Sequence, residues 1–109
     1  MIQHRELAEG RWKEMSLLEQ LSNIGSEVER ALLWTSKTNP KYATKSFERA
    51  LELIDLSFES NRSFSQLKEL ARTRELLVDY FSGTNEYQSS EEFWRKYFLH
   101  FTLALRKNH

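Results

Sequence analysis

Apolar residues recur every three or four positions along most of the chain, which is the spacing of helices with one buried face. The clearest run extends from residue 43 to residue 58, and its apolar positions are Ala43, Phe47, Ala50, Leu51, Ile54 and Phe58. The same spacing gathers carboxylates on the opposite side, namely Glu48, Glu52, Asp55 and Glu59. The run therefore predicts an amphipathic helix that packs on a partner through one face.

Three capping-box sequences mark further helix starts, at residues 16–19, 63–66 and 89–92. In each, a serine hydroxyl and the carboxyl or amide three positions later can satisfy free backbone donors. Pro40 suits the first turn of another helix, because its missing amide hydrogen is not needed there. We therefore expect helices over residues 16–36, 40–59, 63–82 and 89–107. Their short polar links predict an all-α fold, a four-helix up-down bundle over residues 16–109.

Two glycines bear on how these segments pack. Gly25 falls beside the apolar face of the first long helix, where glycine costs up to about 1 kcal/mol relative to alanine, so we expect another backbone to approach closely there. Gly10 is expected to interrupt any helix in residues 1–15. That segment is predicted to be a short helix or an extended arm whose Trp12 packs onto the bundle, with a partly ordered tail as the alternative.

Composition narrows the range of functions. A chain of 109 residues is expected to form one domain. Sixteen basic and sixteen acidic side chains give a net charge of zero, so overall charge offers no support for binding to nucleic acid or to an anionic membrane. Without cysteine, disulfides and thiolate chemistry are excluded. We find no apolar run of membrane-spanning length and no signal-peptide pattern, and therefore expect a cytoplasmic protein without a cofactor.

The last predicted helix carries more aromatic surface than a core of this size needs. Five aromatic residues fall within residues 93–101 and spread over about 140° at about 100° per residue. Large exposed apolar patches are rare on monomers, and two-fold self-association is the commonest way to cover one. We therefore predict a homodimer whose interface contains Trp94, Phe98 and Phe101. In the alternative, the N-terminal arm covers this surface through Leu7 and Trp12.

Acidic side chains supply the first candidate for chemistry. Glu52 and Asp55 are three positions apart, and Glu27 lies on the preceding predicted helix. Carboxylates on adjacent helices can hold Mg²⁺. The arrangement resembles that of the all-α NTP pyrophosphohydrolases, which implies a nucleotide hydrolase with these three residues as metal ligands. The alternative is a solvated face, or ion pairs with arginine and lysine.

A second candidate lies in the last predicted helix, in the run Arg95-Lys-Tyr-Phe-Leu-His100. An arginine and a histidine at this spacing resemble the motif of HEPN ribonucleases, helical bundles whose paired arginine and histidine cut RNA across a dimer interface. The resemblance implies catalytic roles for Arg95 and His100. In the alternative, Arg95 lies on the flank of the helix and His100 is a capping or interface residue.

Arg74 is the third candidate, because it falls near the centre of an apolar stripe. The stripe consists of Leu67, Leu70, Ala71, Leu77, Val78 and Phe81. A buried arginine requires a carboxylate, so we predict a structural ion pair inside the bundle, with Glu27 or Asp55 as its partner. The alternative is an arginine that binds a ligand.

Four segments together resemble a family of small prokaryotic helical proteins without assigned function, at residues 5–12, 24–30, 48–56 and 74–81. The resemblance implies a bacterial or archaeal source and no established activity. Together with the apolar pattern, it favours a non-enzymatic, self-associating helical module that binds a macromolecular partner such as another protein. The HEPN-like ribonuclease and the Mg²⁺-dependent hydrolase are the alternatives.

Overall fold

The computed structural model describes the backbone of residues 5–60 and 62–107, and within these ranges the side chains from residue 10 onward. The described residues form five helices and no strand. They are α1 (Arg5–Glu14), α2 (Leu17–Ser36), α3 (Pro40–Phe58), α4 (Phe64–Ser82) and α5 (Glu91–Lys107). The all-α class expected from the apolar pattern is confirmed. None of these helices has the length together with the apolar composition that a bilayer-spanning segment needs.

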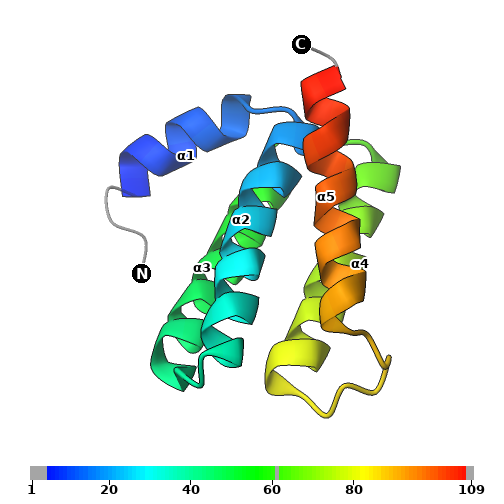
Figure 1. Cartoon of the computed structure of the whole chain (residues 1–109). Coiled ribbons are helices and arrows are strands. Elements are labelled where there is room, and N and C mark those ends of the chain that lie inside the picture. The colour runs from blue at the N-terminus through cyan, green and yellow to red at the C-terminus, as the bar shows by residue number, and fades with distance from the viewer. Residues whose placement is uncertain (1–4, 61, 108–109) are drawn as a thin grey trace.

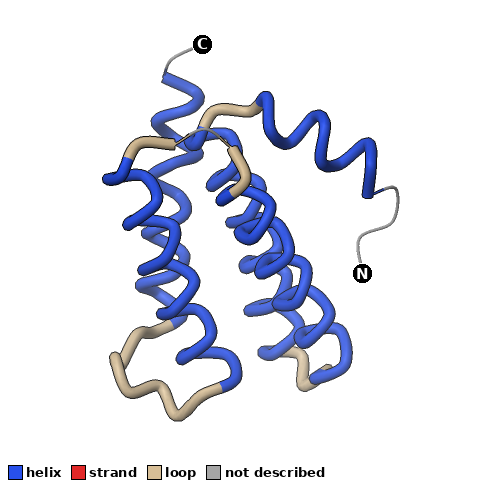
Figure 2. The backbone as a smooth tube through the Cα atoms, turned by 180° about the vertical axis from the view of Figure 1, so that it is seen from behind, coloured by secondary structure: helices blue, strands red, loops and turns tan. Residues whose placement is uncertain are grey.

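Helix α2 lies at the centre of the packing. Its backbone is close to both α3 and α5, α3 also lies against α4, and α1 reaches α3. Figures 1 and 2 show the four long helices side by side, with α1 extending away from one end of α2. The α2–α3 turn and the α4–α5 loop lie together at the other end (Figure 1).

Each long helix contributes fully buried side chains to a common core. Ile24, Ile54, Leu70 and Leu77 have no exposed surface, and Trp94 of α5 is 1% exposed. Fully burying one such side chain contributes about 1.5–3 kcal/mol to stability. These buried side chains from four helices form one hydrophobic core.

Helix α1 runs through Gly10, so the expectation that this glycine interrupts a helix is wrong. Nothing lies within 4 Å of where a Cβ atom at Gly10 would be, so the position is open to solvent and a glycine there costs helix stability without breaking the helix. Trp12 is buried, and its indole Nε1 donates a 2.8 Å hydrogen bond to Ser57 Oγ of α3. Buried Gln20 donates through Nε2 to the Trp12 carbonyl at 2.7 Å. Trp12 therefore fastens α1 to α3 and does not cover the aromatic residues of α5, while the side chain of Leu7 lies outside the described residues.

Two of the three predicted capping boxes are confirmed, those of Ser16 and Ser63. The third is wrong by one residue. Helix α5 starts after Ser90, whose Oγ accepts from the Phe93 amide at 3.1 Å. Ser89 belongs instead to the preceding loop, because its amide donates to Asn85 Oδ1 at 3.0 Å and its Oγ accepts from Trp94 Nε1 at 3.2 Å.

Candidate functional site

Helices α2 and α5 approach each other closely at Gly25. A Cβ atom at this position would lie 2.7 Å from Phe98 Cβ, a distance at which two carbon atoms overlap strongly. The close approach expected at this glycine is confirmed, and the neighbouring helix is α5. Farther along the same contact, the hydroxyls of Ser22 and Thr102 lie 3.0 Å apart. Small side chains on α2 thus set the distance between the two helices.

The aromatic residues of α5 do not form the exposed interface that we expected. Trp94 and Phe98 are 1% and 6% exposed and belong to the core, while Phe101 is half-buried. The backbones of α4 and α5 are farther apart than those of α2 and α5, so large rings are needed to fill the space. The Trp94 ring accordingly lies 6.5 Å from that of Tyr80 on α4. Within the single chain Trp94 and Phe98 therefore present little surface, although both line the groove between α2 and α5, and their part in a dimer interface stays a prediction.

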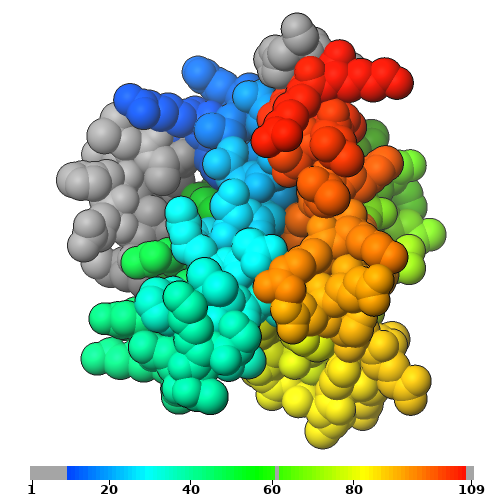
Figure 3. All heavy atoms as spheres, viewed as in Figure 1, coloured from blue at the N-terminus to red at the C-terminus, as the bar shows by residue number. Residues whose placement is uncertain are grey.

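A groove of about 520 Å³ runs along the outside of the contact between α2 and α5. The α2 side of the groove carries Ser22, Gly25 and Ser26, and the α5 side carries Leu99 and Thr102. Figure 3 shows the two helices next to each other on this side of the molecule, α2 in cyan and α5 in orange and red. Larger side chains complete the lining of the groove, namely Val28, Glu29, Arg30 and Leu32 of α2 and Trp94, Arg95 and Phe98 of α5.

The two helices beside this groove also expose three large aliphatic side chains. Leu33, Leu99 and Leu103 are 41%, 52% and 51% exposed, and Leu33 lies two turns beyond Ser26 on the same side of α2. The other exposed large hydrophobic side chains in the described part of the chain are all aromatic, namely Tyr42 on α3, Phe64 on α4, Tyr87 in the α4–α5 loop and Phe93 on α5. We use the name α2/α5 face for the groove together with Leu33, Leu99 and Leu103.

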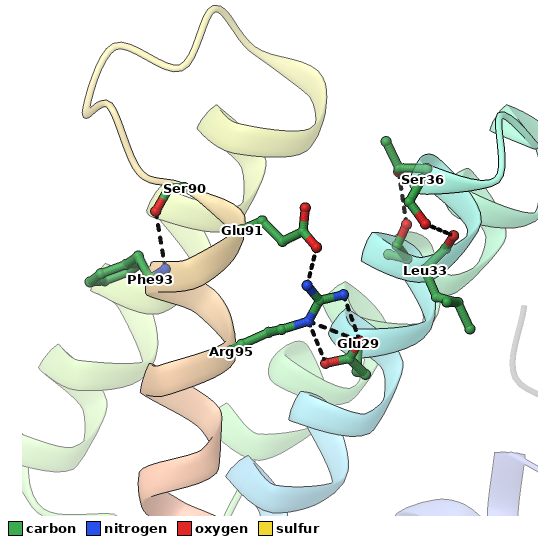
Figure 4. Close-up of polar contacts among 9 residues, drawn as sticks. Glu29, Leu33, Ser36, Ser90, Glu91, Phe93 and Arg95 are labelled. Atoms are coloured by element: carbon green, nitrogen blue, oxygen red, sulfur yellow. Dashed lines mark hydrogen bonds and ion pairs between the residues drawn. The ribbon is translucent and has the colours of Figure 1, made fainter.

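Arg95 lines the groove and reaches from α5 to Glu29 of α2 (Figure 4). Its Nε and Nη2 lie 3.0 Å from Glu29 Oε1 and Oε2 respectively, and its Nη1 donates to Glu91 one turn earlier. The hydrogen bonds with Glu29, followed by those with Glu91, raise the pKa of Arg95 above its ordinary value, although partial desolvation opposes them. Because the side chain is 40% exposed, these pairs contribute at most about 1 kcal/mol. They tie α2 to α5 and occupy the guanidinium.

His100, the other residue of the HEPN-like motif, lies on a different side of α5. It is exposed, and its ring meets that of Phe101 edge-on at 5.4 Å. Arg95 and His100 are separated by about 140° around the helix, and the polar partners of Arg95 are Glu29 and Glu91. The structure of the single chain therefore does not bring the two candidate catalytic residues together.

The predicted metal ligands are also separated. Glu27 Oε1 lies 2.6 Å from Arg30 Nη1 on its own helix, Asp55 pairs with Arg74, and Glu52, three residues before Asp55 on α3, is half-buried. Among the described residues, no three acidic or histidine side chains converge as metal ligands would. The ion-pair alternative describes Glu27 and Asp55 as they lie in this structure.

Arg74 pairs with Asp55, through Nε to Oδ1 at 2.8 Å and Nη2 to Oδ2 at 3.4 Å. The two side chains are 40% and 55% exposed, so the prediction of a pair inside the core is wrong. The reason is a rotation of α4 by about one residue, or 100°. Thr73, at 1% exposure, occupies the inward position between Leu70 and Leu77.

Thr73 takes part in a polar bridge between α4 and α5 that the sequence analysis missed. The Tyr97 hydroxyl lies 2.6 Å from Thr73 Oγ1 and also donates to Glu69. Burial raises the pKa of Tyr97 above its ordinary value, and the hydrogen bond to Glu69 raises it further. A cavity of about 130 Å³ adjoins the bridge. The available signal was the position of Thr73, three residues after Leu70 and four before Leu77.

Leu99 and Leu103 were missed as well. They are four positions apart on a side of α5 that also carries Glu92, Lys96 and Arg106, so they contribute little to the amphipathic pattern. Two aliphatic residues one turn apart on an otherwise charged side of the helix were the available signal.

Comparison with known proteins adds no assignment. No protein-family model matches the chain, and no similar curated protein or solved structure was found.

Proposed function

We propose that the chain is a non-enzymatic interaction module, a four-helix up-down bundle of α2 to α5 that associates with a second copy of itself through the α2/α5 face. The observation that carries the proposal is the exposure of Leu99 and Leu103, one turn apart on α5, beside a groove of about 520 Å³ that Leu99 lines. Apolar patches with polar surroundings are typical of protein contacts. The short side chains of Ser22 and Ser26 on the α2 side of the groove leave room for leucine side chains from another helix.

The charges along α5 favour an antiparallel contact between two copies. Glu91 and Glu92 begin the helix, and Arg106 and Lys107 end it. Glu92 and Arg106 each lie two turns from Leu99, on the same side of the helix. If two α5 helices cross antiparallel with Leu99 on the two-fold axis, Glu92 of each copy faces Arg106 of the other. Such a contact is self-complementary, as a two-fold interface requires.

The size of the patch predicts a modest affinity. Three half-exposed leucines provide less apolar surface than an obligate dimer buries, and their surroundings remain charged. We therefore expect reversible association, with monomer and dimer both present at micromolar concentrations. The same face could be occupied by a helix of another protein, and this alternative predicts a monomer when the chain is studied alone.

Sedimentation velocity across a concentration series up to tens of micromolar tests the proposal. Leu99→Glu should give a monomer, because it places the negative charges of the two copies next to each other on the two-fold axis. Phe64→Glu is the matched control, since Phe64 is a more exposed hydrophobic residue on α4, at 79%, and should leave the association unchanged. A parent protein that is monomeric throughout the series would refute self-association.

Charge exchange tests the antiparallel arrangement. Glu92→Arg alone should weaken the dimer, because it places two arginines opposite each other. The double variant Glu92→Arg/Arg106→Glu should restore it, since each facing pair is then complementary again. If Glu92→Arg left the dimer unchanged, self-association would stand but the antiparallel arrangement would be refuted.

A further inference from the structure

The zero net charge of the chain conceals a separation of charge at one end of the molecule. Residues 31–47 contain Lys37, Lys41 and Lys45 and no acidic residue. Residues 75–94 contain five acidic residues and no lysine or arginine. The α2–α3 turn and the α4–α5 loop, which these segments include, lie at the same end of the molecule (Figure 1). A basic surface and an acidic surface are therefore neighbours there.

Two aromatic rings accompany the three lysines. The rings of Trp34 and Tyr42 meet edge-on with centroids 4.9 Å apart. Lys37 Nζ lies 5.5 Å from the centre of the Trp34 ring, and Lys45 Nζ lies 5.9 Å from that of Tyr42. Tyr42 is 45% exposed and Trp34 is half-buried. The packed rings and the ammonium groups form one continuous surface, which we name the lysine–aromatic patch (Trp34, Lys37, Lys41, Tyr42 and Lys45).

The cations of this patch are available to a ligand. In the described part of the chain, Lys37, Lys41 and Lys45 form no ion pair, whereas Arg30, Arg74 and Arg95 are each held by a carboxylate. The cation–π contacts are weak at exposed sites, about 0.5–1 kcal/mol, so a phosphate can displace them. On the other flank of the same turn, Thr35, Thr38 and Asn39 line a hollow of about 240 Å³.

We infer that the lysine–aromatic patch binds single-stranded nucleic acid without sequence preference. Such binding combines lysines that follow the phosphates with aromatic rings on which bases stack, and both features occur together in this patch. An acidic peptide would need only the lysines. An anionic membrane surface would also attract lysines accompanied by tryptophan and tyrosine, so binding to anionic vesicles is measured beside binding to the oligonucleotide. The acidic α4–α5 segment repels phosphate and confines the strand to the α2–α3 turn.

Fluorescence anisotropy with a dye-labelled oligothymidine of about fifteen nucleotides tests the inference. Three phosphate contacts predict a slope of roughly −2 in log affinity against log salt, at about −0.7 per contact for single strands. Lys37→Gln/Lys41→Gln/Lys45→Gln should lower the affinity at least about tenfold and flatten this slope. The control Lys13→Gln/Lys68→Gln/Lys107→Gln changes the net charge equally and removes exposed lysines from α1, α4 and α5. It should bind like the parent.

Tyr42→Ala separates stacking from charge attraction. Loss of one stacked base should weaken oligothymidine binding by about tenfold and leave binding of inorganic polyphosphate unchanged. Equal affinity for polyphosphate and oligothymidine, with no effect of Tyr42→Ala, would reduce the patch to a general polyanion site and overturn the inference. Binding to phosphatidylserine vesicles without binding to the oligonucleotide would overturn it too. The test does not depend on self-association, because the patch lies outside the α2/α5 face.

Discussion

Helix α5 contacts its two neighbours in different ways. On the α2 side, Gly25 removes a side chain, and the helices come so close that a Cβ atom would overlap Phe98. On the α4 side, the backbones are farther apart and Tyr97 bridges the space through hydrogen bonds to Thr73 and Glu69. The α2–α5 contact depends on the small volume of the residue at position 25, and the α4–α5 contact depends on hydrogen bonds.

This difference explains where the exposed surface of the molecule lies. The wide α4 side takes up the large rings, so Trp94 and Tyr97 are directed inward. The narrow α2 side has small residues that leave the groove outside, and Leu99 beside it stays exposed. Trp94 and Phe98 are therefore largely covered within the single chain. The candidate interface is aliphatic and follows the close contact.

The largest effect is expected from filling the close contact. Gly25→Ala should lower the free energy of unfolding by about 1–2 kcal/mol, because overpacking costs about 1–3 kcal/mol and the gain in helix propensity offsets up to about 1 kcal/mol. Gly10→Ala is the matched control, since this glycine also lies inside a helix but has nothing within 4 Å of a Cβ position. It should raise the helicity of α1 and leave stability equal or higher. Urea unfolding followed by circular dichroism measures both. Equal responses at the two glycines would show that the α2–α5 contact is not limited by volume.

On the α4 side, Tyr97→Phe should lower the free energy of unfolding by about 1 kcal/mol, the net value of a hydrogen bond.

The pH dependence of stability tests the role of the Tyr97 hydroxyl more specifically. The pKa of Tyr97 is raised in the folded state by burial and by Glu69, so the folded protein keeps a proton that the unfolded chain releases above about pH 10. The stabilisation from Tyr97 is therefore fully present below that pH and is lost as the pH rises further. Between pH 8 and pH 10.5, the urea concentration at the midpoint of unfolding should fall less in Tyr97→Phe than in the parent. An identical fall would show that the hydroxyl is solvated.

The smallest effects are expected from the exposed ion pairs. Arg95→Gln and Arg74→Ala should each lower stability by no more than about 1 kcal/mol, because both arginines are 40% exposed. The differences from the parent should shrink further in 1 M salt, where exposed charges are screened. A loss of several kcal/mol in Arg74→Ala would restore the original prediction of a buried pair.

The helices could be predicted well because their signals are local. A serine with a glutamate or glutamine three positions later caps a helix wherever the helix packs, so Ser16 and Ser63 were identified correctly. The start of α5 was missed by one residue because Asn85 holds Ser89 in the loop. The candidate site was predicted poorly, since Leu99 matters only when the neighbouring side chains on α2 are known.

The sequence by itself determined that the chain is helical, where most helices begin, and that Gly25 needs a close neighbour. These properties follow from spacing and capping within a few residues. The tertiary structure decided which side of each helix is covered. A rotation of α4 by one residue moved Arg74 to the surface and Thr73 inside, and the distance between α4 and α5 drew Trp94 into the core. The pair between Arg95 and Glu29 joins residues 66 positions apart. Such partners are set by the packing of whole helices, and a pattern within one helix does not contain them.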